Sequence, residues 1–170
     1  MSSAGAEPAR RQLDVAAMPE HLGRLYRAAY ALCGSREDAE DLVQETYERV
    51  LRRPRFLRND NDLAYLMRVL RNTFARFQGR RASRPSTPVP TEELDWIQDP
   101  GADPTGSLLE SRAAFAAIAG LSDPLREAIV AVDVVGLPYR DAARALRVRE
   151  GTIMSRLHRA RERVAEVLDG

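Results

Sequence analysis

The chain has 170 residues, of which 44% are hydrophobic and 30% charged, a size and composition that suit one large domain or two small ones. The single Cys33 excludes an intramolecular disulfide framework, and the scattered His21 and His158 offer no metal-ligand spacing. With no glycine-rich phosphate loop either, the sequence predicts neither an enzyme nor a bound cofactor. No apolar run reaches membrane-spanning length and the first residues lack a signal-peptide core, so we expect a cytoplasmic protein. The net charge of +1 hides a strong segregation of charge along the chain.

The first predicted helix begins at Pro19 and ends at Gly34, after a small, polar segment, residues 1–18, that we expect to be a disordered arm. A spacing of three and four residues places its apolar side chains on one stripe. These side chains are Leu22, Leu25, Tyr26, Ala29, Leu32 and Cys33. We therefore interpret Cys33 as a core residue and not as a reactive thiol.

The second predicted helix starts at Ser35, a favourable N-cap residue with Asp38 three positions later, and ends before Pro54. Its apolar stripe comprises Ala39, Leu42, Val43, Thr46, Tyr47, Val50 and Leu51. The opposite face is acidic: residues 35–48 carry six acids and one arginine. Acids first and arginines last match the helix dipole, which is a complete structural explanation. The one-sidedness of the acidic face nevertheless favours a basic protein partner.

A polar loop, residues 55–62, precedes the third predicted helix, residues 63–81. The inner face of this helix comprises Leu63, Leu66, Met67, Leu70, Phe74 and Phe77. Its outer face comprises Tyr65, Arg68, Asn72 and Arg76, with Arg71 on the flank. A row of arginines, an amide and one aromatic ring suits contact with a DNA backbone and with bases. A solvated helix face is the alternative, and the pattern by itself slightly favours it.

The next segment, residues 82–107, is predicted to be a flexible acidic linker because it holds five prolines, and five acids oppose one arginine. Within it, Leu94, Trp96 and Ile97 form a small apolar island. The sequence thus predicts an all-α fold of two small helical domains, residues 19–81 and 108–170, joined by this linker.

The last part of the chain, residues 137–164, is predicted to be a helix-turn-helix with eight arginines and three acids. Ala142 and Ala143 permit a close helix crossing, and Arg147 stands at the turn. The apolar stripe of the second helix comprises Ile153, Leu157, Ala160, Val164, Val167 and Leu168. Its polar side offers Thr152, Ser155, Arg156, His158, Arg159 and Arg163 to a major groove. We favour DNA reading over the alternative, an exposed basic helix pair in an ordinary bundle.

The order of these features resembles that of a bacterial extracytoplasmic-function (ECF) sigma factor of the sigma-70 family. The resemblance covers nearly all of residues 22–167. The segments that carry it are DAEDLVQETYERV (38–50), AYLMRVLRNTF (64–74), LREAIVAVDVVGLPYRDAARAL (125–146) and GTIMSRLHRARERV (151–164). It implies that residues 19–81 are sigma region 2 and that residues 108–170 are sigma region 4. It further implies a factor that binds RNA polymerase core and directs promoter-specific initiation.

The resemblance also implies roles for individual residues. Contacts to the polymerase core, on its β′ clamp, would come from Asp38, Asp41, Gln44, Glu45 and Arg49, and region 4 would meet the β flap. The −10 element would be melted and read by Phe56, Asn59, Asp60, Asn61, Tyr65, Arg68, Arg71, Asn72 and Arg76. The −35 element would be read by Thr152, Ser155, Arg156, His158, Arg159 and Arg163. An anti-sigma factor is a further partner that two small tethered domains would suit.

Some positions depart from the family pattern, Pro138 and Arg149 among them. Tyr65 stands where many members have Trp, Arg76 where many have Asp, and Arg147 at a turn position that is often Gly. If Arg147 is left-handed, its backbone is strained. A one-component helix-turn-helix regulator would explain only the C-terminal half, and a helical adaptor would leave the recognition helix without a role. We expect no further regulatory domain after the recognition helix.

Overall fold

The computed structural model describes residues 11–53, 56–57, 61–81 and 107–170. The predicted linker, its apolar island, residues 1–10 and the loop residues Asn59 and Asp60 lie outside this part of the chain. The described elements are β1 (Arg11–Gln12), the 3-10 helix η1 (Val15–Ala17), α1 (Met18–Cys33), α2 (Arg36–Arg52), β2 (Phe56–Leu57), α3 (Asp62–Arg81), α4 (Ser107–Ala119), α5 (Asp123–Ile129), the π-helical turn η3 (Val130–Val134), α6 (Tyr139–Leu146) and α7 (Glu150–Asp169).

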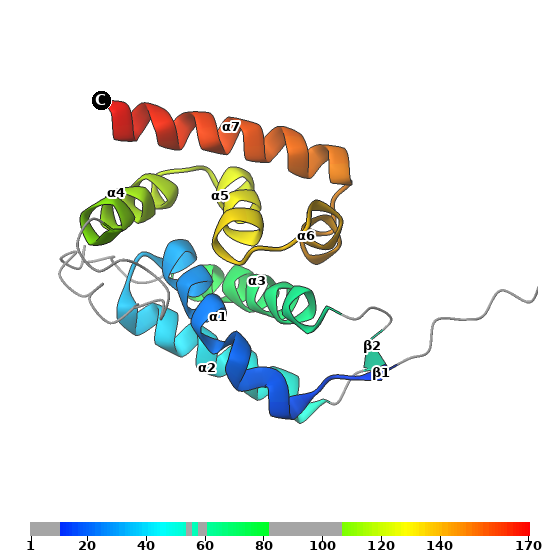
Figure 1. Cartoon of the computed structure of the whole chain (residues 1–170). Helices are drawn as coiled ribbons and strands as arrows, with labels where there is room; N and C mark the ends of the chain where they lie inside the picture. Colours follow the sequence, from blue (N-terminus) through cyan, green and yellow to red (C-terminus); the bar gives the residue numbers. More distant parts are fainter. Residues whose placement is uncertain (1–10, 54–55, 58–60, 82–106) are drawn as a thin grey trace, which may run out of the picture.

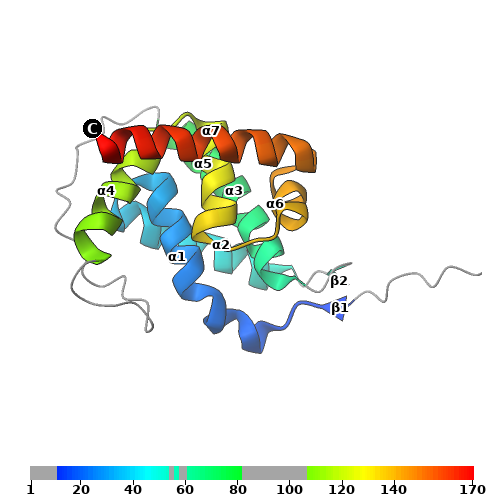
Figure 2. The ribbon, with the colours of Figure 1, turned by 45° about the horizontal axis from the view of Figure 1, so that its top comes forward.

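The helices form two tiers (Figure 1). The first tier holds α1, α2 and α3, which pack on one another. In the second tier α7 lies across α4, α5 and α6, an arrangement that is also plain after rotation (Figure 2). Apart from the two-residue pairing of β1 with β2, the described elements are helical, so the predicted all-α class is confirmed.

Local sequence determines where the first two helices meet. Gly34 adopts φ 75° and ψ 6°, and its N–H donates to the carbonyl of Tyr30 at 2.8 Å, which closes α1 as predicted. Ser35 is extended, and its hydroxyl accepts from the N–H of Asp38 at 3.2 Å, so the predicted N-cap of α2 is confirmed. One glycine and one serine therefore direct α2 back along α1.

Most side chains of the predicted apolar stripes form the core, Cys33, Tyr47, Phe77 and Val164 are half-buried, and there are four exposed exceptions. Leu25, Leu42, Leu66, Leu70, Ile153 and Leu157 have at most 1% of their surface exposed. The exceptions are Leu22, Leu51, Val167 and Leu168, which are 47 to 63% exposed, so their predicted burial is wrong. All four lie towards an end of their helix. Periodicity gives a direction around the helix axis, but it does not say how far along that axis a neighbouring element extends.

The two tiers also pack on each other, which the sequence did not predict. Tyr30 and Phe115 meet edge to face, with ring centroids 5.7 Å apart and planes at 88°. α3 packs on α6, and α1 packs on η3 and α4. Buried apolar side chains of both halves belong to one continuous cluster. The described parts of the two predicted domains therefore share an interface.

Of the predicted disordered arm, residues 1–18, the structure describes residues 11–18, and these form β1, η1 and the start of α1. Arg11 and Gln12 pair antiparallel with Leu57 and Phe56. Leu13 is only 7% exposed. β1 and β2 lie over 40 positions apart in the sequence, so no local pattern could predict their pairing.

Replacing Leu70 by alanine should lower the free energy of unfolding by about 2–5 kcal/mol, because a side chain with no exposed surface would leave a cavity. Chemical denaturation measures the effect. Leu51→Ala, at a side chain that is 52% exposed, is the control and should change stability by less than about 0.5 kcal/mol. Equal losses for both variants would contradict the core as described.

Candidate protein and nucleic-acid interfaces

The acidic face of α2 divides into exposed and engaged side chains. Asp41 and Gln44 are exposed, whereas Asp38, Glu45 and Arg49 are half-buried. Asp38 is held at the helix start, where the Ser35 hydroxyl donates to its carboxylate at 2.8 Å. Within the described residues Asp41 has no ion pair, so its carboxylate is open to solvent.

Glu45 connects two helices. Its carboxylate accepts from Arg49 of α2 at 2.7 Å and from Arg80 of α3 at 3.0 Å. Burial raises the pKa of Glu45, but the hydrogen bonds from Arg49 and Arg80 outweigh this effect and hold it below the ordinary value. The pair Glu45–Arg49 has the i,i+4 spacing that sequence can suggest, whereas Arg80 is 35 positions away and was missed.

A groove of about 1030 Å³ runs between α2 and α3 and brings together two predicted sets of residues. The α2 side contributes the predicted polymerase contacts Asp41, Gln44, Glu45 and Arg49. The α3 side contributes the predicted DNA contacts Tyr65, Arg68, Asn72 and Arg76. Arg147 of the second tier also lines the groove. The α2 side therefore mixes carboxylates with the guanidinium groups of Arg49, Arg52 and Arg53, whereas the α3 side carries guanidinium groups, an amide and a phenol but no carboxylate.

Two other predicted DNA contacts face the second tier. The Arg71 guanidinium is 3.4 Å from the carboxylate of Glu127 in α5. The Asn61 amide donates to Asp141 of α6 at 2.8 Å, while its oxygen accepts from the N–H of Ala64 at 3.0 Å. The structure therefore does not bring these two side chains into the groove. Phe56 lies in β2, and only its backbone pairing is described.

The helix-turn-helix has the predicted geometry. Ala142 and Ala143 are buried where α6 packs on α7. Arg147 ends α6 with φ 56° and ψ 44°, so the left-handed conformation considered from the sequence is confirmed. Val148 N–H donates to the carbonyl of Ala143 at 3.0 Å and closes the turn. α7 then starts directly at Glu150.

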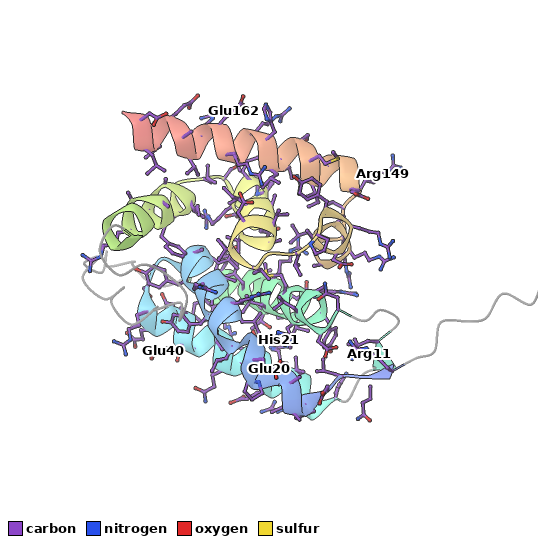
Figure 3. All side chains as sticks on the ribbon, in the orientation of Figure 1. Arg11, Glu20, His21, Glu40, Arg149 and Glu162 are labelled. Atoms are coloured by element: carbon purple, nitrogen blue, oxygen red, sulfur yellow. The ribbon has the colours of Figure 1, made fainter. Side chains whose placement is uncertain are left out.

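The polar side of α7 is open to solvent. Ser155, His158, Arg159 and Arg163 are exposed, and Thr152 and Arg156 are half-buried. His158 lies 3.1 Å from Glu162, which projects on the outer side of the helix (Figure 3). Because Ile153, Leu157 and Ala160 anchor the opposite side with at most 1% exposure, the polar side is held in a fixed orientation.

Arg161 secures α7 to the turn between α5 and α6. Its guanidinium donates to both carboxylate oxygens of Asp133, at 2.7 and 3.0 Å. These hydrogen bonds raise the pKa of Arg161 above its ordinary value. Asp133 lies in η3, and nothing in the sequence pattern pointed to this π-helical turn or to this pair.

Arg147→Gly should stabilise the chain by about 0.5–1 kcal/mol, because glycine adopts a left-handed conformation without the steric cost of a side chain. Thermal unfolding should show a rise of about 2–3 °C. The control is Arg144→Gly, at an exposed position inside α6, which should destabilise by about 1 kcal/mol. A loss of stability in both variants would refute strain at Arg147.

The described residues contain no group of three or more histidine, cysteine or acidic side chains placed to hold a metal ion. None of their helices combines the length and the apolar character needed to cross a bilayer.

Comparisons with known proteins agree with this geometry. Residues 18–84 match the Sigma-70 region 2 family, and residues 111–164 match the Sigma-70, region 4 family. The chain is 34% identical over 165 residues to the ECF RNA polymerase sigma factor SigE of Mycolicibacterium smegmatis, covering 91% of this chain and 64% of that protein. It is 33% identical over 149 residues to SigM of Mycobacterium tuberculosis, covering 87% of this chain and 73% of SigM.

A solved structure extends the likeness to three dimensions. The sigma factor RpoE from Bartonella quintana, in complex with the anti-sigma factor NepR, superposes with a TM-score of 0.69 at 29% identity. The match covers 89% of this chain and 94% of RpoE. By sequence, by family match and by fold, this chain belongs to the ECF RNA polymerase sigma factors.

Proposed function

We propose that this chain binds RNA polymerase core and directs promoter-specific transcription initiation. The observation that carries the proposal is the groove between α2 and α3, in which all the lining carboxylates come from α2 and the α3 side carries arginines without a carboxylate. Carboxylates repel the phosphates of DNA and attract a basic protein surface, whereas guanidinium groups do the opposite. A protein partner and a DNA strand can therefore lie side by side along this groove.

Each predicted set of residues keeps its proposed role. The exposed side chains of Asp41 and Gln44 make the main contacts with the polymerase core. The half-buried side chains of Asp38, Glu45 and Arg49 add further contacts. Tyr65, Arg68, Asn72 and Arg76 meet the −10 element, where an aromatic ring can stack on an unpaired base. The remaining proposed −10 contacts are Phe56, Asn59, Asp60, Asn61 and Arg71.

The polar side of α7 reads the −35 element in this proposal. Arginine gives bidentate hydrogen bonds to guanine in the major groove, which suits Arg156 and Arg159. Thr152, Ser155 and His158 offer shorter donors and acceptors, and Arg163 is placed for a phosphate.

The same proposal covers organisation and partners. Residues 19–81 act as region 2 and residues 108–170 as region 4, with residues 82–107 as the linker. We expect no enzymatic activity and action in the cytoplasm, on the nucleoid as part of the holoenzyme. The B. quintana relative is in complex with an anti-sigma factor, and we expect a regulator of that kind for this chain.

Co-purification with RNA polymerase core, followed by run-off transcription from genomic fragments, tests the proposal. The expected result is a stable complex and transcripts that start at defined sites only when the chain is added. Tight DNA binding without core association would overturn it in favour of a one-component regulator. Such a regulator is not favoured, because residues 18–84 match sigma region 2.

A further inference from the structure

A short N-terminal segment, residues 11–18, holds both ends of the loop that leads into α3. At one end β1 pairs antiparallel with β2, with Arg11 opposite Leu57 and Gln12 opposite Phe56. At the other end the guanidinium of Arg11 forms a hydrogen-bonded ion pair with Asp62, the first residue of α3. Figure 3 shows Arg11 at the end of the molecule where β1 and β2 lie.

This N-terminal segment is itself fixed to the first tier. Leu13 and Met18 are 7% and 3% exposed. The Tyr47 hydroxyl of α2 donates to the carbonyl of Met18 at 2.8 Å, and burial raises the pKa of that phenol, which keeps it a donor. Asp14 accepts from the N–H of Ala16 at 3.0 Å and starts η1. The backbone that carries Arg11 is therefore fixed to the first tier, and Arg11 can restrict the positions of Leu57 and Asp62.

The contact with Asp62 acts where α3 begins. The Asp62 side chain is only 12% exposed and that of Arg11 32%, so water competes weakly for the carboxylate. An acid in the first turn of a helix is favoured by the helix dipole, and Arg11 fixes its direction. Tyr65 and Arg68 follow within two turns of α3 and line the groove.

We propose that Arg11 is a positioning residue for reading the −10 element. Through its backbone pairing with Leu57 and its ion pair with Asp62, it ties β2 to the start of α3. The inference rests on the proposed role of the α3 side of the groove in −10 recognition. It assigns a part in selectivity to Arg11, which lies before the region 2 family match that begins at residue 18.

The test compares holoenzymes reconstituted with wild-type, Arg11→Ala and Arg11→Lys chains. The probe is forked DNA from a promoter found by run-off transcription, carrying either its own single-stranded −10 sequence or a scrambled one. Arg11→Ala should reduce the preference for the matched strand by about three- to tenfold, the size expected for one or two lost hydrogen bonds. Arg11→Lys, which keeps the charge, should restore part of the preference.

The controls separate positioning from general stability. Arg24→Ala removes an exposed arginine of α1 that has no ion pair within the described chain, and it should leave the preference unchanged. Core affinity and binding to duplex −35 DNA should stay within about twofold of wild type in every variant, since neither surface includes Arg11. In an Asp62→Asn background, Arg11→Ala should have a smaller effect than in the wild-type background, because the two side chains act as a pair.

Each outcome decides one point. An unchanged preference in Arg11→Ala would overturn the inference while leaving the proposed function intact. An equal loss for matched and scrambled strands, not repaired by Arg11→Lys, would show a purely structural role and would also overturn it. A wild-type holoenzyme without any preference would refute the −10 role itself.

Discussion

Asp41→Arg should weaken the binding of this chain to RNA polymerase core by about a hundredfold, because a like charge would then face the basic partner surface. Asp41 is exposed and has no ion pair among the described residues, so its replacement breaks no contact within the fold. Glu45 is a poorer target despite its place in the same predicted set. Its carboxylate joins Arg49 to Arg80, and reversing its charge would disturb the packing of α2 on α3.

Equilibrium binding of the labelled chain to core measures this effect. Glu20→Arg is the matched control, since it makes the same charge reversal at an exposed position of α1 (Figure 3). It should bind core like the wild type. Unfolding curves should coincide for all three proteins. Unchanged core affinity in Asp41→Arg would remove the acidic face of α2 from the interface.

Arg159→Ala should cost about 1–3 kcal/mol of discrimination between a matched and a scrambled −35 element, the value of one bidentate contact to a base. Arg159 is exposed on the polar side of α7, and Ile153 and Leu157 hold the opposite side in the core. The fold and the binding of core should therefore be unaffected. Binding of the holoenzyme to the two promoter DNAs, measured at one fixed salt concentration, gives the ratio directly.

Arg144→Ala provides the contrast for that experiment. Arg144 is an exposed arginine of α6, outside the predicted base-reading set. A contact to phosphate carries no sequence information. If this variant has any effect, it should therefore lower the affinity for the matched and the scrambled DNA equally. Equal discrimination by the wild type and Arg159→Ala would exclude Arg159 from base reading.

Local chemistry was sufficient to predict α1, α2, α3 and the helix-turn-helix of α6 and α7, but not α4, α5 or η3. Ser35 caps α2 and Gly34 ends α1 because a hydroxyl and a missing Cβ act on the nearest backbone groups. Arg147 drew notice only through the family pattern, in which Gly is frequent at this turn position, and the structure shows it to be left-handed with φ 56°. The two predicted surfaces also emerged from periodicity, since the acidic side of α2 and the polar side of α7 lie opposite buried stripes.

Contacts between distant segments were beyond the reach of these patterns. Arg80 meets Glu45, Asp133 meets Arg161, and β1 pairs with β2, each across at least 28 positions. Periodicity gives each helix a buried side but no partner or register, and many arginines could equally serve each acid. For the same reason the sequence could not show that Arg71 and Asn61 point at the second tier.

The contacts between the tiers also affect how DNA binding should depend on salt. When the two tiers are packed together, Arg71 forms an ion pair with Glu127. A guanidinium held in this ion pair cannot also fully neutralise a DNA phosphate. Added salt displaces protein from DNA, but it also weakens this internal ion pair and so releases Arg71. The two effects oppose each other. The logarithm of the DNA-binding constant should therefore fall less steeply with the logarithm of salt concentration than the number of phosphate contacts in the complex predicts. Glu127→Gln, which removes the internal ion pair, should make this slope steeper.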